Sequence, residues 1–139
     1  MTGALRSAEE VLLGHEAEGE LVICSIFADQ RPIKGVAGGL DWRLRGLISE
    51  FIKLGRIAGH RDEVVYLPIR HQGGMRHLMI VGLGELHGPE AHSTLFEKLA
   101  RTATSLNFRR VALSRSSFPF GDDQKIRRAF KGIDVEFTA

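Results

Sequence analysis

Two hydrophobic patterns alternate along the chain: short unbroken apolar runs, and longer stretches with an apolar residue every three or four positions. The run at residues 20–27, ELVICSIF, has strand length and is rich in β-branched residues, which is typical of a strand covered on both faces. Similar short runs lie at residues 63–69, 77–83, 110–115 and 133–137. Together they predict five strands.

Helical spacing is clearest at residues 40–54. The apolar positions on one side are Leu40, Leu44, Leu47, Ile48 and Phe51. Arg43, Arg45, Ser49, Glu50 and Lys53 take the other side. This pattern predicts one amphipathic helix, and Gly55 is placed to end it.

Two further helices are predicted in the second half of the chain. One begins with Pro89 in its first turn and runs to about Asn107. Its expected inner face consists of Leu95, Phe96, Leu99, Ala103 and Leu106. Residues 122–130 predict a shorter helix.

The strands at 63–69 and 77–83 are joined by RHQGGMR, whose Gly73-Gly74 pair suits a hairpin connection. Pro68 lacks the amide that a central strand needs, so the first of these strands is expected at a sheet edge. His71 and His77 flank the turn and could face each other across it.

Residues 5–13 leave two interpretations open. Ser7-x-x-Glu10 before Val11 is a capping-box pattern that predicts a short helix, but EEVLLG could equally be an edge strand. The remaining order is strand, helix, strand, strand, helix, strand, helix, strand. It predicts an α/β fold with a mixed, mainly parallel sheet and helices on both faces, formed by residues 1–139 as a single domain.

Composition narrows the cellular setting. Hydrophobic residues make up 43% and charged residues 26%, as in soluble globular proteins. Cys24 is the only cysteine and lies in a buried-type strand, so no internal disulfide is expected. The acidic first 20 residues differ from a signal peptide, and no apolar stretch has the length of a membrane span. We therefore expect a cytoplasmic protein that does not associate with a membrane.

Charge is unevenly distributed. The net charge is −4 over residues 1–20 and +4 over residues 101–139, where eight basic residues face four acidic ones. Arg109, Arg110, Arg127 and Arg128 are candidate nucleic-acid contacts. The alternative is a solvated surface, because no Tyr or Trp is interleaved for base stacking. We expect at most weak binding of nucleic acid.

The segment HLMIVGLGELHGPE, residues 77–90, is the sharpest candidate site. Gly82, Gly84 and Gly88 follow a strand and precede a helix, where backbone amides can hold a phosphate. A dinucleotide fingerprint would need its third glycine at the position of His87, and no acidic residue ends the next strand to bind a ribose. No cofactor is expected. The turn is either a ligand site for a small phosphate compound or a structural corner.

Other chemistry-bearing residues do not form a convincing site. His87 and His92 are five residues apart, with Glu90 between them, and this spacing does not place both imidazoles on one helix face. Ser114, a candidate nucleophile, lacks a Gly-x-Ser-x-Gly elbow. Cys24 is expected to be an inert hydrophobe. We therefore predict no metal site and no catalytic residue.

The succession of elements resembles the amino-terminal domain of the leucine (cytosol) aminopeptidases over residues 20–107. The matching features are Leu40-Asp41, Leu54-Gly55, Tyr66-Leu67-Pro68 and Val81-Gly82-Leu83-Gly84. The resemblance implies a three-layer, macro-domain-like fold, favours a strand at residues 9–13, and implies that the Gly-Leu-Gly turn is a structural corner.

In the resembled family the chemistry belongs to a separate carboxy-terminal domain with two metal ions, whose ligands have no counterpart among these residues. The resemblance therefore implies a free-standing, non-catalytic binding, regulatory or assembly module. Its partner would be a protein, either a second copy or a separate aminopeptidase-like chain. The alternatives are a macro-domain-like module for a nucleotide or ADP-ribose, and weak nucleic-acid binding.

Overall fold

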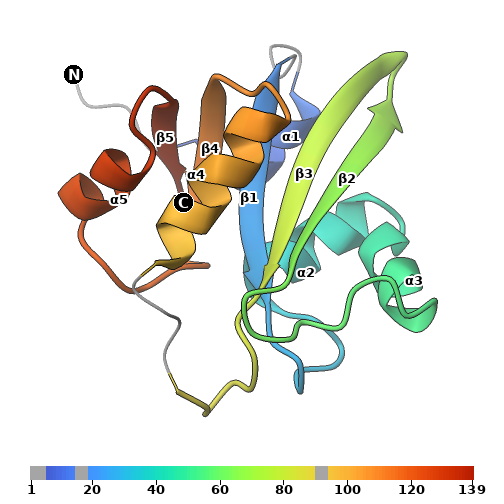
Figure 1. Ribbon diagram of the computed structural model, residues 1–139. Helices are drawn as coiled ribbons and strands as arrows, with labels where there is room; N and C mark the ends of the chain where they lie inside the picture. Colours follow the sequence, from blue (N-terminus) through green and yellow to red (C-terminus); the bar gives the residue numbers. More distant parts are fainter. Residues whose placement is uncertain (1–5, 15–18, 90–93) are drawn as a thin grey trace.

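The computed structural model describes residues 6–14, 19–89 and 94–139, and within these ranges five strands form one mixed sheet (Figure 1). Their order in the sheet is β2-β3-β1-β4-β5. The strands are β1 Glu20–Ile26, β2 Val64–His71, β3 Gly74–Gly82, β4 Arg110–Ser114 and β5 Asp134–Thr138. β1 pairs in parallel with β3 and β4, and β4 pairs in parallel with β5, whereas β2 and β3 are antiparallel. The prediction of a mixed, mainly parallel sheet is confirmed.

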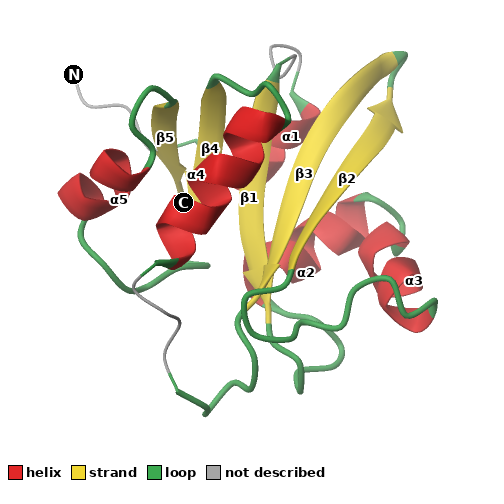
Figure 2. Cartoon of the chain, viewed as in Figure 1, coloured by secondary structure: helices red, strands yellow, loops and turns green. Residues whose placement is uncertain are grey.

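Helices cover both faces of this sheet, as predicted (Figure 2). The first group is α1 Ala8–Leu13, α2 Gly35–Arg43 and α3 Leu47–Lys53. The second group is α4 Leu95–Ser105 and α5 Asp123–Ala129. Because strand side chains alternate between faces, Leu21 and Ile23 pack under α4 while Val22 and Cys24 pack under α1 to α3. The sheet and its two groups of helices therefore form three layers.

The single helix predicted at residues 40–54 is wrong, because the chain turns between Arg43 and Leu47. Arg45 and Gly46 both have positive φ, 58° and 81°, which interrupts the helix. Asp41 fixes the corner: its carboxylate accepts hydrogen bonds from the amides of Ile48 at 2.7 Å and Ser49 at 3.0 Å, at the start of α3. The apolar positions keep their helical spacing across this break, so the spacing alone could not predict the break.

The predicted helix end at Gly55 is confirmed. Gly55 has φ 75°, its amide donates to the carbonyl of Ile52, and the amide of Arg56 donates to the carbonyl of Phe51. These two bonds define a Schellman motif, which satisfies carbonyls that the end of a helix leaves unpaired.

The strand that the resemblance favoured at residues 9–13 is also wrong. This stretch is helix α1, and the capping box is present in full. The Ser7 hydroxyl accepts from the amide of Glu10 at 3.0 Å, and the Glu10 carboxylate accepts from the amide of Ser7. Of the two interpretations left open for this stretch, the capping-box helix is the one that the structure shows.

The hairpin between β2 and β3 is confirmed, and its connection is tighter than the sequence suggested. Gln72 and Gly73 form a two-residue turn with positive φ at both positions, as a type I′ turn requires. β2 is the edge strand, as Pro68 predicted. His71 and His77 do not face each other, because His77 pairs with Pro68 and His71 pairs with Gly74.

Pro89 does not begin the following helix as predicted: it lies in a loop, and α4 starts at Leu95. The inner face of this helix is confirmed, with Leu106 packed at its end as a partly buried member. Its buried residues include Leu95, Phe96, Leu99 and Ala103. In the ranges that the structure describes, no helix is long and apolar enough to cross a membrane.

Candidate functional site

The glycine turn at the end of β3 lies at the edge of the sheet where the parallel strands end, at the bottom of Figure 1. Its backbone amides already have partners inside the protein. The amide of Gly82 donates to the carbonyl of Glu63 at 2.7 Å, that of Leu83 to Ile26 at 3.0 Å, and that of Gly84 to Gly59 at 2.9 Å. A phosphate held here would have to displace these hydrogen bonds.

Close packing explains why Gly82 is a glycine. A Cβ at this position would lie 2.0 Å from the backbone oxygen of His60 and 2.6 Å from the carbonyl carbon of Gly59. Gly84 has φ 79°, which disfavours side chains, and its carbonyl accepts from the amide of Ala28 at 2.8 Å. The geometry favours the structural-corner interpretation of this turn.

Gly88, the third candidate ligand residue, is placed differently from the other two. Its amide donates to the carbonyl of Glu85 at 3.0 Å, within a local turn. Ligand binding by Gly82, Gly84 and Gly88 therefore stays a prediction, and none of the three offers an amide that is free in this structure.

Two of the four candidate nucleic-acid arginines hold parts of the protein together. Arg110 forms an ion pair at 2.9 Å with Glu20, which is only 5% exposed. Arg127 donates to the carbonyl of Val135 at 2.6 Å and lies over the ring of Phe137. These contacts commit both guanidinium groups to internal partners.

Arg109 and Arg128, the other two arginines, are exposed, and each lines a hollow that Lys131 also lines. Arg128 and Lys131 line a hollow on α5 together with Gln124 and Arg127. Lys131 also lines a second hollow with Arg109 and Phe108. The sequence interpretation missed Lys131, although positions 124, 127, 128 and 131 follow the helical spacing that marks one face.

A second charged cluster surrounds Glu20, at the end of the sheet where β1 begins, opposite the end that holds the glycine turn. Nε of Arg6 donates a hydrogen bond to the Glu136 carboxylate at 2.7 Å, and Nη2 of Arg6 lies 3.5 Å from the Glu20 carboxylate. Arg110 forms an ion pair with the same Glu20 carboxylate. The hydrogen bond to Glu136 raises the pKa of Arg6 above its ordinary value, against the opposing effect of partial burial. This network holds the start of the described chain against β1 and β5.

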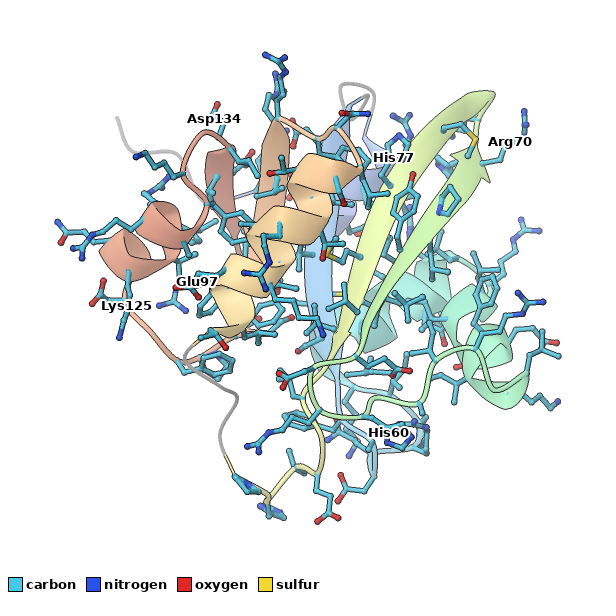
Figure 3. The ribbon with its side chains drawn as sticks, viewed as in Figure 1. His60, Arg70, His77, Glu97, Lys125 and Asp134 are labelled. Carbon is cyan, nitrogen blue, oxygen red and sulfur yellow. The ribbon has the colours of Figure 1, made fainter. Side chains whose placement is uncertain are left out.

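An aromatic cluster lies on the α4 face of the β2–β3 hairpin. The rings of Tyr66 and His77 are stacked, with the Tyr66 hydroxyl 2.7 Å from Nδ1 of His77, and Phe108 packs edge-on against both. Burial lowers the pKa of His77 and raises that of Tyr66. His60 lies near the other end of the sheet (Figure 3), so these two histidines do not converge on one site.

Metal-ligand and nucleophile chemistry finds little support in the described residues. They contain no group of three or more His, Cys, Asp or Glu residues that could hold a metal ion. Glu90 and His92, which were considered together with His87, lie outside the described residues. Burial raises the pKa of Cys24 to about 12, which keeps this thiol protonated. Ser114 shares a 2.8 Å hydrogen bond with the hydroxyl of Ser117.

Trp42 is a surface feature that the sequence interpretation missed. It is the only tryptophan in the chain, and its side chain is 78% exposed on α2. The spacing at residues 40–54 contained the signal, because Trp42 falls outside the apolar stripe that includes Leu40 and Leu44. Trp42 is a candidate contact residue, because tryptophan is enriched where protein partners meet.

Comparisons with known proteins give a consistent result. The model of the family described as "Cytosol aminopeptidase family, N-terminal domain" matches residues 25–134. Among solved structures, a mutant of tomato leucine aminopeptidase matches with a TM-score of 0.55 and 20% identity; the match covers 85% of this chain and 28% of the tomato enzyme. The chain thus spans about a quarter of that enzyme's length.

Two macrodomains match over nearly their whole length. The macrodomain of Mycobacterium tuberculosis DarG gives a TM-score of 0.64 at 15% identity, with 97% of each chain covered. The macrodomain of Thermus aquaticus DarG gives a TM-score of 0.58 at 18% identity, with 99% of each covered. At these identities the likeness concerns the fold alone, and it confirms the macro-domain-like fold that the resemblance implied.

Proposed function

This chain belongs to the cytosol aminopeptidase family through its N-terminal domain, and on that premise we propose that these residues form a non-catalytic binding and assembly module. The module would act through contacts with another protein, either a second copy of itself or an aminopeptidase-type chain. Catalysis would belong to whichever polypeptide carries the metal-binding domain of the family.

The observation that carries this proposal is the extent of the family match. It covers 110 of the 139 residues, and the model is that of the N-terminal domain. The strand-end edge supports the same view, because the amides of Gly82 and Gly84 are occupied by backbone carbonyls. These hydrogen bonds favour a packed corner at that edge, so we expect function on exposed surfaces.

A direct test is hydrolysis of leucine amides by the purified protein in the presence of Zn²⁺, Mn²⁺ or Co²⁺. We expect no turnover above background, because a bound metal ion is what activates water in two-metal hydrolases. Metal-dependent turnover that co-purifies with this protein through a second column would contradict the proposal.

Weak nucleic-acid binding is a second candidate, favoured because Lys131 shares one hollow with the exposed Arg128 and another with the exposed Arg109. Arg109, Lys131 and Arg128 line adjoining hollows, and Phe108 lines one of them. Phosphate contacts by three cations would give binding that weakens steeply as salt rises. Substitution of these three residues by Ala should remove it, whereas Arg110→Ala should act mainly through stability, because Arg110 pairs with Glu20.

Binding of a nucleotide or ADP-ribose at the glycine turn stays a prediction. A ligand that binds only the folded protein should raise its melting temperature in proportion to its affinity. We expect no shift with ADP-ribose, because the amides of Gly82, Leu83 and Gly84 are already hydrogen-bonded. A clear shift that disappears in Gly84→Val would instead support the ligand site.

A further inference from the structure

We infer that the outward face of α2 is a docking surface for an acidic segment of a protein partner. The surface, called the Trp42 face below, consists of Trp42, Gly39 and Arg45. The inference rests on the proposed assembly role and adds to it the surface that makes the contact and the chemistry of the partner.

The indole of Trp42 is not part of the hydrophobic core. The side of α2 that packs against the sheet presents Ala37 and Leu40, which are both fully buried, whereas Trp42 is 78% exposed. Tryptophan is usually among the most buried residues, and it is enriched where protein partners meet. An exposed indole on a regular helix therefore indicates a contact made outside this chain.

The corner that follows α2 holds Trp42 in place. The neighbouring Asp41 is 8% exposed, and its two carboxylate oxygens accept hydrogen bonds from the amides of Ile48 and Ser49 and from the Ser49 hydroxyl. These contacts lock α2 against α3. A rigid backbone lowers the entropy lost when Trp42 docks.

Two adjacent glycines in α2 have different reasons to be there. A Cβ at Gly38 would lie 2.6 Å from the carbonyl oxygen of Ile33, so the fold itself requires that glycine. A Cβ at Gly39 would meet nothing within 4 Å, yet glycine is unfavourable inside a helix. Gly39 lies three residues before Trp42 and leaves bare backbone beside the indole, where a partner can approach closely.

The positive charge of residues 34–56, which include the Trp42 face, favours an acidic partner. Residues 34–56 contain five basic and two acidic residues, a net charge of +3, and one of the two acids is the buried Asp41; counting Glu9, which pairs with Arg43, the net charge is +2. Arg43 pairs at 2.9 Å with Glu9 of α1, so an acidic helix already lies beside α2 within this chain. Arg45 has no side-chain partner in the parts of the chain that the structure describes, and it remains available to a carboxylate of another protein.

Two other occupants are less compatible with this charge. A symmetric pair of Trp42 faces would bring the cations of two copies together, which disfavours a second copy of the chain. An anionic membrane would match the sign of the charge. However, residues 34–56 offer only two exposed large apolar side chains, Trp42 and Leu54, and stable membrane anchoring needs more buried apolar surface than that. Both occupants are included as outcomes of the experiment.

The experiment uses the fluorescence of Trp42, which is the only tryptophan in the chain. The probe is an amphipathic peptide of Leu and Glu in helical spacing, compared with its counterpart carrying Lys in place of every Glu. We expect the acidic peptide to shift the emission of Trp42 to shorter wavelength, less so at high salt, and the basic peptide to leave it unchanged. In the free protein, iodide should quench Trp42 more strongly than caesium does.

Matched variants separate docking from folding, with affinity read from the anisotropy of labelled acidic peptide. Arg45→Glu should weaken binding roughly tenfold or more, whereas Arg128→Glu on the remote helix α5 should not. Trp42→Ala should remove binding, and Leu86→Ala, at another exposed apolar side chain, should not. Gly39→Leu should block the face while leaving the melting temperature at or above that of the wild type, because its Cβ meets nothing.

Several results would overturn the inference. The first two are equal binding of the acidic and basic peptides, and equal effects of Arg45→Glu and Arg128→Glu on peptide affinity. The third is a dimer in sedimentation that Trp42→Ala dissociates. The fourth is binding of the protein to phosphatidylserine vesicles but not to the acidic peptide. Each would leave the non-catalytic proposal standing. Turnover of leucine amides would remove that proposal without changing the peptide result, so the two failures can be told apart.

Discussion

Replacing Gly82 by alanine tests the structural role of the glycine turn with a single methyl group. The added Cβ would lie 2.0 Å from the backbone oxygen of His60 and 2.6 Å from the carbonyl carbon of Gly59. Both are backbone atoms, so no side chain can rotate away. Either β3 or the segment at residues 59–60 must move by about an ångström to restore ordinary contact distances.

The surrounding hydrogen bonds resist that movement. The amide and carbonyl of Gly82 bond to Glu63 and Asp62, and the Glu63 carboxylate holds the amides of Ala58 and Gly59 at 3.0 and 2.7 Å. Overpacking of this kind, with at least one hydrogen bond stretched, should cost about 3 kcal/mol. For a domain of this length that loss lowers the melting temperature by roughly 10 °C.

Alanine substitution at two other glycines provides a comparison: one is expected to lower the free energy of unfolding and the other to raise it. The added Cβ of Gly84→Ala meets only atoms of Arg61, of which the Cβ is nearest at 3.4 Å, but the residue retains φ 79°, so the cost should be about 1–2 kcal/mol. Gly39→Ala lies in α2 with open space around its Cβ and should stabilise the protein by about 0.5–1 kcal/mol. The expected order of stability is therefore Gly39→Ala, wild type, Gly84→Ala, Gly82→Ala.

Urea and thermal unfolding of the four proteins, without ligand, measure this order. If Gly82→Ala unfolds like the wild type, the close approach of β3 to residues 59–60 is not what requires the glycine. Loss of ADP-ribose binding in a variant of unchanged stability would then mean that the turn is a ligand site.

Three further predictions concern single side chains. Asp41→Ala should lower stability by about 1–2 kcal/mol in urea unfolding, because α3 loses the cap that its first amides use; Asp41→Asn should recover part of the loss. Burial lowers the pKa of His77, so the unfolded chain binds a proton at higher pH than the folded protein does. The free energy of unfolding should therefore be highest above about pH 6.5 and should decrease as the pH falls. In urea unfolding at several pH values, His77→Phe should show a smaller decrease than the wild type. With a pKa raised to about 12 by burial, Cys24 should resist iodoacetamide in the folded protein and react once urea unfolds it; rapid labelling of the native protein would contradict this burial.

Local chemistry in the sequence predicted the elements whose ends are fixed by neighbouring residues. The capping box of Ser7 and Glu10, the helix end at Gly55 and the edge position of Pro68 each follow from one or two residues, and each is present. The alternation of apolar runs also predicted the sheet and its two helical layers, because burial on both faces leaves a direct trace in composition.

The break between α2 and α3 could not be predicted from the same signals. Leu40, Leu44, Leu47 and Ile48 keep helical spacing across the corner, although Gly46 has positive φ. The corner depends on Asp41 reaching the amides of α3, a contact between positions seven and eight residues apart that periodicity does not record. Resemblance to a family was also a poor guide at residues 9–13, where local capping decides for helix.

The candidate surfaces were predicted only in part, because sequence spacing does not show which charges are already paired. Arg110 and Arg127 look equivalent to Arg109 and Arg128 in the sequence, yet Glu20 and the carbonyl of Val135 occupy the first two. Trp42 was visible as a tryptophan on the polar side of a helical pattern. Its exposure became clear only from the fold, in which 78% of its side chain is exposed among the described residues.

The central claim is that these residues act through an exposed surface, and that the glycine turn is structural. One amide NMR titration tests both parts, because an amide spectrum records the indole N–H of Trp42 together with the backbone amides of Gly82 and Gly84. We predict that the acidic peptide shifts the Trp42 indole signal, and that ADP-ribose leaves the two glycine amides unmoved. ADP-ribose shifts at Gly82 and Gly84, together with an indole signal that the acidic peptide does not move, would contradict the account.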